Sequence, residues 1–147
     1  MSTLPSGVQR IALVVLLSWD SRTVLLDRRT GRTAWWPLCL DVSKTSSYMG
    51  TAHRWLRQQS ALPEACLGDV TGHLTLTDNT ASGTIERDYC VVILKLTGSA
   101  DAELLSPSAR WWPIEQLGQA AFPQELGALM EGYVGGWIPD GPVTLDG

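Results

Sequence analysis

Runs of apolar residues predict the main strands of this chain. Residues 8–17 form a run rich in Val, Ile and Leu, which is typical of a buried strand. Residues 89–96 (YCVVILKL) are the most apolar run and predict a central strand. Residues 70–77 alternate apolar with polar or small residues, as a half-buried strand does. Shorter strands are expected at residues 23–27, 33–40 and 110–113, and loops at 41–50 and 78–83.

Helical periodicity predicts two helices. Residues 49–60 place Ala52, Leu56 and Gln59 on one stripe, and Pro63 follows soon after. Residues 123–133 place their apolar residues on one core-facing side, namely Leu126, Leu129, Met130 and Tyr133. Strands followed by a helix, and then strands followed by a second helix, predict an α+β fold. We expect an α/β/α sandwich in which helices flank a mixed sheet.

The length and composition fit a single domain over residues 1–147. The apolar fraction of 44% and the charged fraction of 18% are typical of a globular chain. A chain of 147 residues is long enough to bury an ordinary core without disulfides or metals. The Gly- and Pro-rich segment 136–147 is expected to be a loosely held tail.

Charge and cysteine usage indicate which partners and which cellular compartment to expect for the protein. A net charge of −4 gives no general attraction to nucleic acids or acidic membranes, so neither is expected as a partner. Cys39, Cys66 and Cys90 show no CxxC and no partner histidine at metal spacing, which favours buried thiols in a reducing compartment. The apolar run 11–17 is too short to span a bilayer, and no signal-peptide cleavage site follows it. A cytoplasmic location is expected.

Seven tryptophans against one phenylalanine leave two roles open, core packing and ligand stacking. Four of them form the pairs Trp35-Trp36 and Trp111-Trp112. Since successive side chains of a strand face opposite ways, one of each pair should pack inward and the other should face a cleft or solvent. Exposed tryptophan predicts contact with an aromatic ligand, with a protein partner or with a second copy in a homodimer.

Several segments, in their order along the chain, resemble the Nudix superfamily. They are residues 23–29 (TVLLDRR), 34–37 (AWWP), 52–57 (AHRWLR), 88–96 (DYCVVILKL) and 110–117 (RWWPIEQL). Family members carry a comparable strand, then W-x-x-P-G-G, then the box G-x5-E-x7-R-E-U-x-E-E-x-G-U, in which U is a bulky aliphatic residue. The resemblance covers nearly the whole chain and implies the Nudix fold.

Aligning the box arginine with Arg54 shows which box residues the chain lacks. The box glycine then falls at Leu40, or at Cys39 if the loop is one residue longer. Leu56 and Leu62 keep the aliphatic type that the box requires. The positions of the four box glutamates are held by Ser46, Trp55, Gln58 and Gln59. The box therefore keeps residues that pack the helix and loses those that carry the chemistry.

The resemblance implies that metal-dependent catalysis is lost. Family members hold divalent ions through the box carboxylates, and magnesium prefers negatively charged oxygen ligands. Gln58 and Gln59 offer neutral amide oxygens, and Trp55 offers no oxygen. Without the metal, nothing in the box neutralises a diphosphate or generates a hydroxide nucleophile. No metal site and no cofactor are expected, and a metal-dependent pyrophosphohydrolase is disfavoured.

Two interpretations stay open for each polar or aromatic residue of the box helix. Arg54 either accepts a phosphate or carboxylate or pairs with an acid such as Asp41. Trp55 either stacks on a flat ligand in the family's cleft or plugs that cleft. His53 is either a surface residue or a general base. The predicted ligand-binding residues are Arg54, Trp55, Gln58, Gln59, Trp36 and Trp112.

Acidic residues near the expected cleft are candidates for proton transfer. Glu86 and Asp88 flank the start of the central strand and are either solvated charges or acids that act on a ligand. Asp41 and His53 complete the set of catalytic candidates. Cys39 resembles the proton-transferring cysteine of the isopentenyl diphosphate isomerase branch. Since that branch keeps a metal and motifs that this chain lacks, a buried structural thiol is favoured for Cys39.

These observations lead to three functional hypotheses. The leading one is a divergent Nudix-fold protein whose cleft binds or transforms a small organic ligand, anionic or aromatic, without metal, as an enzyme of specialised metabolism would. The second is a non-catalytic binding module, a sensor or scaffold that contacts another protein through exposed tryptophans. The third is a hydrolase of nucleoside-diphosphate derivatives that uses relocated carboxylates. Fold alone does not choose among them.

Overall fold

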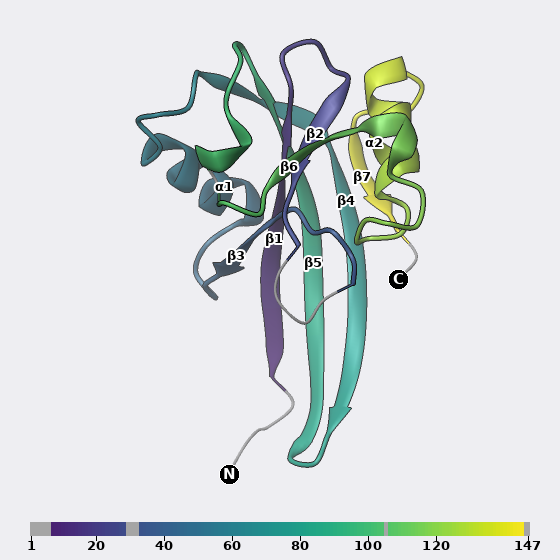
Figure 1. The fold of residues 1–147 in the computed structure, drawn as a ribbon. Helices are drawn as coiled ribbons and strands as arrows, with labels where there is room; N and C mark the ends of the chain where they lie inside the picture. Colours follow the sequence, from purple (N-terminus) through teal and green to yellow (C-terminus); the bar gives the residue numbers. More distant parts are fainter. Residues whose placement is uncertain (1–6, 29–32, 105, 146–147) are drawn as a thin grey trace.

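Two helices cover opposite faces of a mixed sheet, which confirms the predicted α+β class (Figure 1). The computed structural model describes residues 7–28, 33–104 and 106–145. Within these residues the strands are β1 (Val8–Leu17), β2 (Thr23–Leu26), β3 (Leu38–Val42), β4 (Ala65–Thr80), β5 (Gly83–Leu96), β6 (Arg110–Pro113) and β7 (Gly141–Thr144). The helices are α1 (Tyr48–Arg57), α2 (Leu126–Gly135) and the short 3-10 turns η1 (Ala102–Leu104) and η2 (Ile114–Gln116).

Strand β1 is the centre of the sheet, whose order is β6-β2-β1-β5-β4-β7. It runs parallel to β5 over its whole length, from Val8 opposite Glu86 to Leu17 opposite Lys95. Its other edge pairs antiparallel with β3 over Arg10–Val14 and meets β2 at Leu17. The predicted central strand is therefore confirmed as part of β5, which lies between β1 and β4.

Strand alternation divides the core into two layers. Odd-numbered residues of β1, such as Leu13 and Val15, pack with Leu126 and Met130 of α2 and its neighbours. The even-numbered Val14 and Leu16 belong to the layer that contains Ala52 of α1. Residues at successive positions of β1 or β5 thus face different helices. This division decides which side chains can share a site.

Helix α1 begins at a capped residue and ends earlier than the predicted residue 60. The Ser47 side chain accepts a hydrogen bond from the Gly50 N–H at 2.9 Å, which is a typical N-cap. At the other end, the N–H groups of Gln58 and Gln59 bond to carbonyls three residues back. These tighter bonds end the α-helical geometry, so the helix stops at Arg57.

The β4–β5 hairpin is longer than the sequence pattern predicts. Its strands pair until Thr80 opposite Gly83, so the predicted loop over residues 78–83 is a continuation of both strands around a two-residue turn. Gly83 has a φ of 135°, which favours glycine at this corner. Figure 1 shows the hairpin extending beyond the rest of the sheet, beside the N-terminal end of β1.

The segment expected to be a loosely held tail contains a strand over residues 141–144. Gly136, with a φ of 74°, ends α2 in the left-handed conformation. Residues 141–144 then form β7, which runs parallel to β4 from Val70 opposite Gly141 to His73 opposite Thr144. Val143 and Leu145, two positions apart, both pack on the α2 side of the sheet, and Leu145 is buried. Packing of these two apolar side chains on the core holds residues 141–145 against the sheet.

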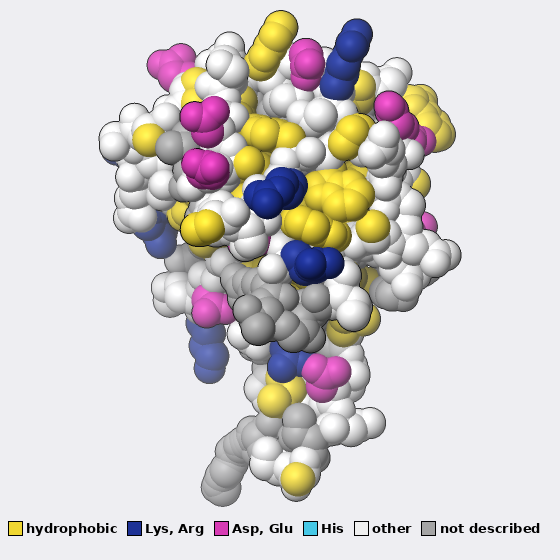
Figure 2. Space-filling model, viewed as in Figure 1, with side chains coloured by type: hydrophobic (Ala, Val, Ile, Leu, Met, Phe, Trp, Pro, Cys, Tyr) yellow, Lys and Arg dark blue, Asp and Glu magenta, His cyan; other side chains and the backbone are white. Residues whose placement is uncertain are grey.

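Among the described residues, no helix is both long and apolar enough to cross a membrane. Figure 2 shows acidic, basic and hydrophobic side chains interspersed on the face viewed.

Candidate functional site

A cleft of about 590 Å³ opens on the α2 side of the sheet, near the N-terminal end of β1. Its lining comes from four strands and two loops, namely Gln9, Ile11, Trp36, Cys39, Asp41, Leu76, Asp78, Arg87, Tyr89 and Phe122. The strand residues come in pairs two positions apart, because side chains at that spacing project from the same face. The volume lies within the range of small-molecule sites, about 300–1,000 Å³.

Three aromatic rings form one wall of this cleft. The rings of Trp36 and Phe122 stack with centroids 3.9 Å apart and planes at 20°. Tyr89 meets Phe122 edge-on at 5.2 Å and Trp36 at 6.1 Å. Backbone hydrogen bonds hold the stacked pair: Trp36 and Asp27 exchange two of them, and the Phe122 N–H donates to the Trp35 carbonyl at 2.9 Å. The wall is therefore fixed before any ligand arrives.

A polar network crosses the opposite end of the cleft. Arg87 forms an ion pair with Asp78 across the β4–β5 hairpin. Its Nε donates to Gln9 Oε1 at 3.3 Å, and Gln9 Nε2 donates to Asp41 Oδ1 at 3.3 Å. Among the described residues, the cleft lining carries two carboxylates against one guanidinium, so this part of the lining is negatively charged. Such an end favours hydrogen-bond donors or a cation over a diphosphate.

The structure does not bring Arg54 and Trp55 to this cleft, so their predicted role in ligand binding stays a prediction. Trp55 is half-buried against the core layer on the α1 side of the sheet. Arg54 is exposed on the outer side of α1, in a shallow hollow with His53, Gln58 and neighbouring residues. The reason is topological, since α1 packs on the sheet face opposite to the cleft.

Gln58 and Gln59 also separate from each other. Gln58 is exposed beside Arg54, whereas Gln59 is half-buried and its Nε2 donates to the Trp55 carbonyl at 3.3 Å. Trp112 lies on the α2 side, where its ring contacts Trp35 at 5.2 Å. Of the predicted ligand-binding residues, Trp36 lines the cleft; Trp112 packs against the core nearby and does not border it.

Of the four predicted catalytic residues, the structure places Asp41 in the cleft. Glu86 and Asp88 alternate along β5 with the cleft residues Arg87 and Tyr89, so their side chains project from the other face. Asp88 accepts a hydrogen bond from the Thr75 hydroxyl there at 2.8 Å. His53 is exposed on α1.

Five polar or aromatic residues of the cleft lining were not predicted from the sequence: Gln9, Asp78, Arg87, Tyr89 and Phe122. A signal existed for three of them. Gln9 precedes the buried Ile11 by two positions, and Arg87 and Tyr89 have the same spacing at the start of the central strand. Period-two spacing predicts that such side chains share a face. Phe122 comes from the loop before α2, and only the tertiary fold brings it to Trp36.

The donor set of the box region does not fit a divalent cation. The positions Ser46, Trp55, Gln58 and Gln59 supply no carboxylate, and three of them point in different directions. Across residues 7–28, 33–104 and 106–145, no group of three or more His, Cys, Asp or Glu side chains is arranged to hold a metal ion. Magnesium is usually held by one or two carboxylates together with waters and substrate phosphates, and the box positions supply none.

A cysteine and a histidine lie together on the other face of the sheet. The Cys90 sulfur is 3.9 Å from His73 Nε2, and the same nitrogen is 2.9 Å from the Thr71 hydroxyl. Burial raises the pKa of the Cys90 thiol to about 11. Since the thiolate is the nucleophile, this cysteine is at neutral pH almost wholly in its less reactive thiol form.

The fold is similar to those of solved Nudix proteins. One is an Ap4A hydrolase from C. elegans, with 18% identity, a TM-score of 0.58, and 90% of this chain and 100% of that chain covered. Another is the MutT protein of methicillin-resistant Staphylococcus aureus 252, described as a Nudix hydrolase, with 15% identity, a TM-score of 0.61, and coverage of 88% and 98%. A third is the mutator MutT protein of Bacillus halodurans, with 15% identity and a TM-score of 0.55. The match covers 94% of this chain and 89% of that chain. No protein-family model and no curated protein matches the sequence. The chain has the Nudix fold.

Proposed function

We propose that this Nudix-fold chain binds a small planar organic ligand in the cleft on the α2 side, without a divalent metal. The observation that carries the proposal is the juxtaposition of a fixed aromatic wall with a polar, negatively charged end in one cleft of suitable volume. Ligand sites commonly combine apolar walls with a few polar groups that fix orientation.

The chemistry of the lining suggests how such a ligand would lie. A flat ring would pack against the wall formed by Trp36, Tyr89 and Phe122, where stacking geometry favours aromatic partners. Its polar edge would reach the Asp41 carboxylate, which Gln9 already orients. A hydrogen-bond donor or a cationic group on that edge would complement the carboxylate. If the ligand is also transformed, Asp41 is the acid positioned to accept its proton.

A second candidate is hydrolysis of a nucleotide derivative, and similarity to a protein named Ap4A hydrolase supports it. Such a reaction would use carboxylates relocated from the box, and Asp41 and Asp78 line the same cleft. Asp78 is already paired with Arg87. Magnesium is usually held by one or two carboxylates together with waters and substrate phosphates, so two carboxylates are not too few. We rank this candidate second because one of the two is already engaged by a guanidinium.

A ligand screen tests the first proposal. Planar aromatic amines and matched aromatic carboxylates would be screened by thermal shift in EDTA, with wild type, Trp36→Leu and Trp137→Leu. Trp137 is 70% exposed outside the cleft and serves as the matched control. We expect amines to raise the Tm of wild type and Trp137→Leu and to act weakly on Trp36→Leu. A shift that Trp36→Leu leaves intact, or one that requires metal, would overturn the proposal.

A further inference from the structure

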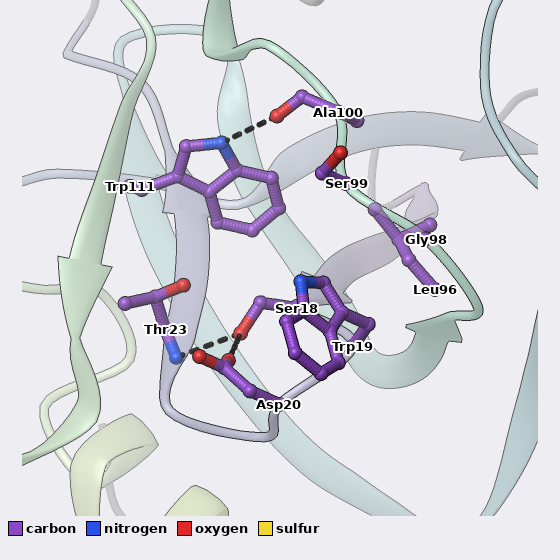
Figure 3. Close-up of a pocket in the computed structure, with 9 residues that line it drawn as sticks. All are labelled: Ser18, Trp19, Asp20, Thr23, Leu96, Gly98, Ser99, Ala100 and Trp111. Atoms are coloured by element: carbon purple, nitrogen blue, oxygen red, sulfur yellow. Dashed lines mark hydrogen bonds between the residues drawn. The ribbon is translucent and has the colours of Figure 1, made fainter.

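A second hollow, of about 160 Å³, lies at the far end of the sheet from the cleft. It is bordered by the turn between β1 and β2, by the loop that follows β5, and by Trp111 of β6. Figure 3 shows the indoles of Trp19 and Trp111 bordering one opening, with the Asp20 carboxylate beside Ser18 at its edge. Residues 12–17 of β1 separate Ile11 of the cleft from Ser18 of the hollow, by about 23 Å along the strand.

The turn that carries Trp19 and Asp20 is held by its own hydrogen bonds. The Ser18 hydroxyl accepts from the Thr23 N–H at 3.0 Å and donates to Asp20 Oδ1 at 2.6 Å. The Arg22 N–H reaches Asp20 Oδ1 at 3.2 Å. These bonds fix the carboxylate, so the position of Asp20 does not depend on a ligand.

The two tryptophans are held differently. Trp111 is half-buried, and its indole N–H donates to the Ala100 carbonyl at 2.9 Å, which locks the ring. Trp19 is 58% exposed on the turn after β1, so its ring is accessible to a ligand. The hollow therefore combines one locked indole with one that faces solvent.

The charge at the hollow is negative. Asp20 is the ionisable residue of the lining, and the hydrogen bond from Ser18 lowers the pKa of its carboxyl. The hydrogen bonds from the Ser18 hydroxyl and the Arg22 N–H both go to Oδ1 of this carboxylate. The Arg22 side chain is close enough to favour the ionised form but does not line the hollow.

We propose that this hollow binds the trimethylammonium head of a small free cation of the choline type, between the indoles of Trp19 and Trp111 and beside Asp20. Tryptophan faces attract quaternary ammonium groups through their negative quadrupole, and a carboxylate adds a charge attraction. A head group without hydrogen-bond donors suits two indole faces. The volume is too small for a nucleotide-sized molecule.

Calorimetric titration with choline, and with its neutral isostere 3,3-dimethylbutan-1-ol, tests this site. Trp19→Leu removes an aromatic face at an exposed position, and we expect choline affinity to fall about 2- to 30-fold, the range of a cation–π contact. Asp20→Asn keeps the Oδ1 acceptor of the turn and removes the charge, so affinity should fall about 5-fold. Trp137→Leu, at an exposed tryptophan elsewhere, should leave choline binding unchanged.

Each outcome decides the proposal. Binding of choline in preference to the isostere, weakened by Trp19→Leu and Asp20→Asn, supports it. Equal binding of the isostere would make the hollow merely apolar and would overturn it, as would no choline binding to wild type. A trimethyllysine peptide that binds when choline does not would assign the site to a protein partner instead. Far-UV circular dichroism checks that each variant is folded.

Discussion

Trp36 and Phe122 stack with ring centroids 3.9 Å apart, although one follows β2 and the other precedes α2. This contact ties the loop before β3 to the loop before α2 and forms the aromatic wall of the cleft. The two loops are joined a second time by the hydrogen bond from the Phe122 N–H to the Trp35 carbonyl. The aromatic wall of the candidate site thus depends on a tertiary contact between two loops. The polar residues of the cleft are positioned by the strand register of the sheet.

Trp36→Leu should destabilise the fold as well as weaken ligand binding. The substitution removes the stack on Phe122 and the edge contact with Tyr89, and we expect a loss of roughly 2 kcal/mol in the free energy of unfolding. Urea unfolding followed by circular dichroism measures this loss. Trp137→Leu, at an exposed position, should change the free energy by less than about 0.5 kcal/mol. Equal effects from the two substitutions would contradict a packed aromatic wall.

Arg87→Met should have little effect on stability. The Arg87 and Asp78 side chains are 28% and 56% exposed, and ion pairs so accessible to water contribute about 0–1 kcal/mol. The substitution leaves the cleft more negative, so binding of an aromatic amine should strengthen and should depend more on salt. Urea unfolding and titrations at two ionic strengths measure these effects. A stability loss above about 3 kcal/mol would show that the ion pair holds the hairpin, contrary to this account.

Cys90 should make the stability of the protein fall in alkali. Its folded pKa of about 11 lies above the ordinary value of 9.0, because burial disfavours the thiolate. Between these pH values the unfolded chain has lost the proton and the folded chain keeps it. The free energy of unfolding should therefore decrease as pH rises through this window, by up to about 1.4 kcal/mol per pH unit. Below pH 9 the contribution is fully present.

Cys90→Ala should flatten that slope, as measured by urea unfolding at pH 8, 9 and 10. Tyr48 and Tyr133 also have pKa values raised by burial, so a residual slope above pH 10 is expected in the variant. A slope between pH 9 and 10 that Cys90→Ala leaves unchanged would mean that the thiol is hydrated in solution.

Leu145→Ala should destabilise the protein, because Leu145 directly follows β7 and packs in the core. Leu145 is 6% exposed, contacts the core on the α2 side, and donates its N–H to the His73 carbonyl at 2.8 Å. Removing its buried methyl groups should lower the free energy of unfolding by about 2–4 kcal/mol. The neighbouring Thr144 is exposed, so Thr144→Ala is the control and should have a small effect. Equal, small effects would support a loosely held tail.

Sequence patterns predicted the elements better than the site. The apolar runs at 8–17 and 89–96 predicted β1 and the buried part of β5, because both are covered on two faces and contain little else. The hairpin beyond Tyr89 was missed, since its polar residues are typical of a loop and only cross-strand pairing makes them a strand. Strand β7 was missed because Gly141 and Pro142 are typical of turns.

The site required knowledge of which sheet face each element covers. The spacing of Arg54 and Trp55 on a helix was visible in the sequence, but the side of the sheet against which α1 packs was not. Asp41 was predicted and lines the cleft, yet its neighbours Gln9 and Arg87 come from strands that pair with β3 or with β1. Strand order and register bring such residues together, and neither can be deduced from the spacing within one strand.

The most direct test of the central claim, a cleft that works without metal, is a hydrolysis panel. Nucleoside triphosphates, ADP-ribose, sugar nucleotides and coenzyme A would each be incubated with wild type and Asp41→Asn, in magnesium, in manganese and in EDTA. The account predicts no metal-dependent product and no metal-induced rise in the Tm of wild type. Metal-dependent turnover by wild type that Asp41→Asn abolishes would contradict it, and would assign the cleft carboxylates to a metal instead.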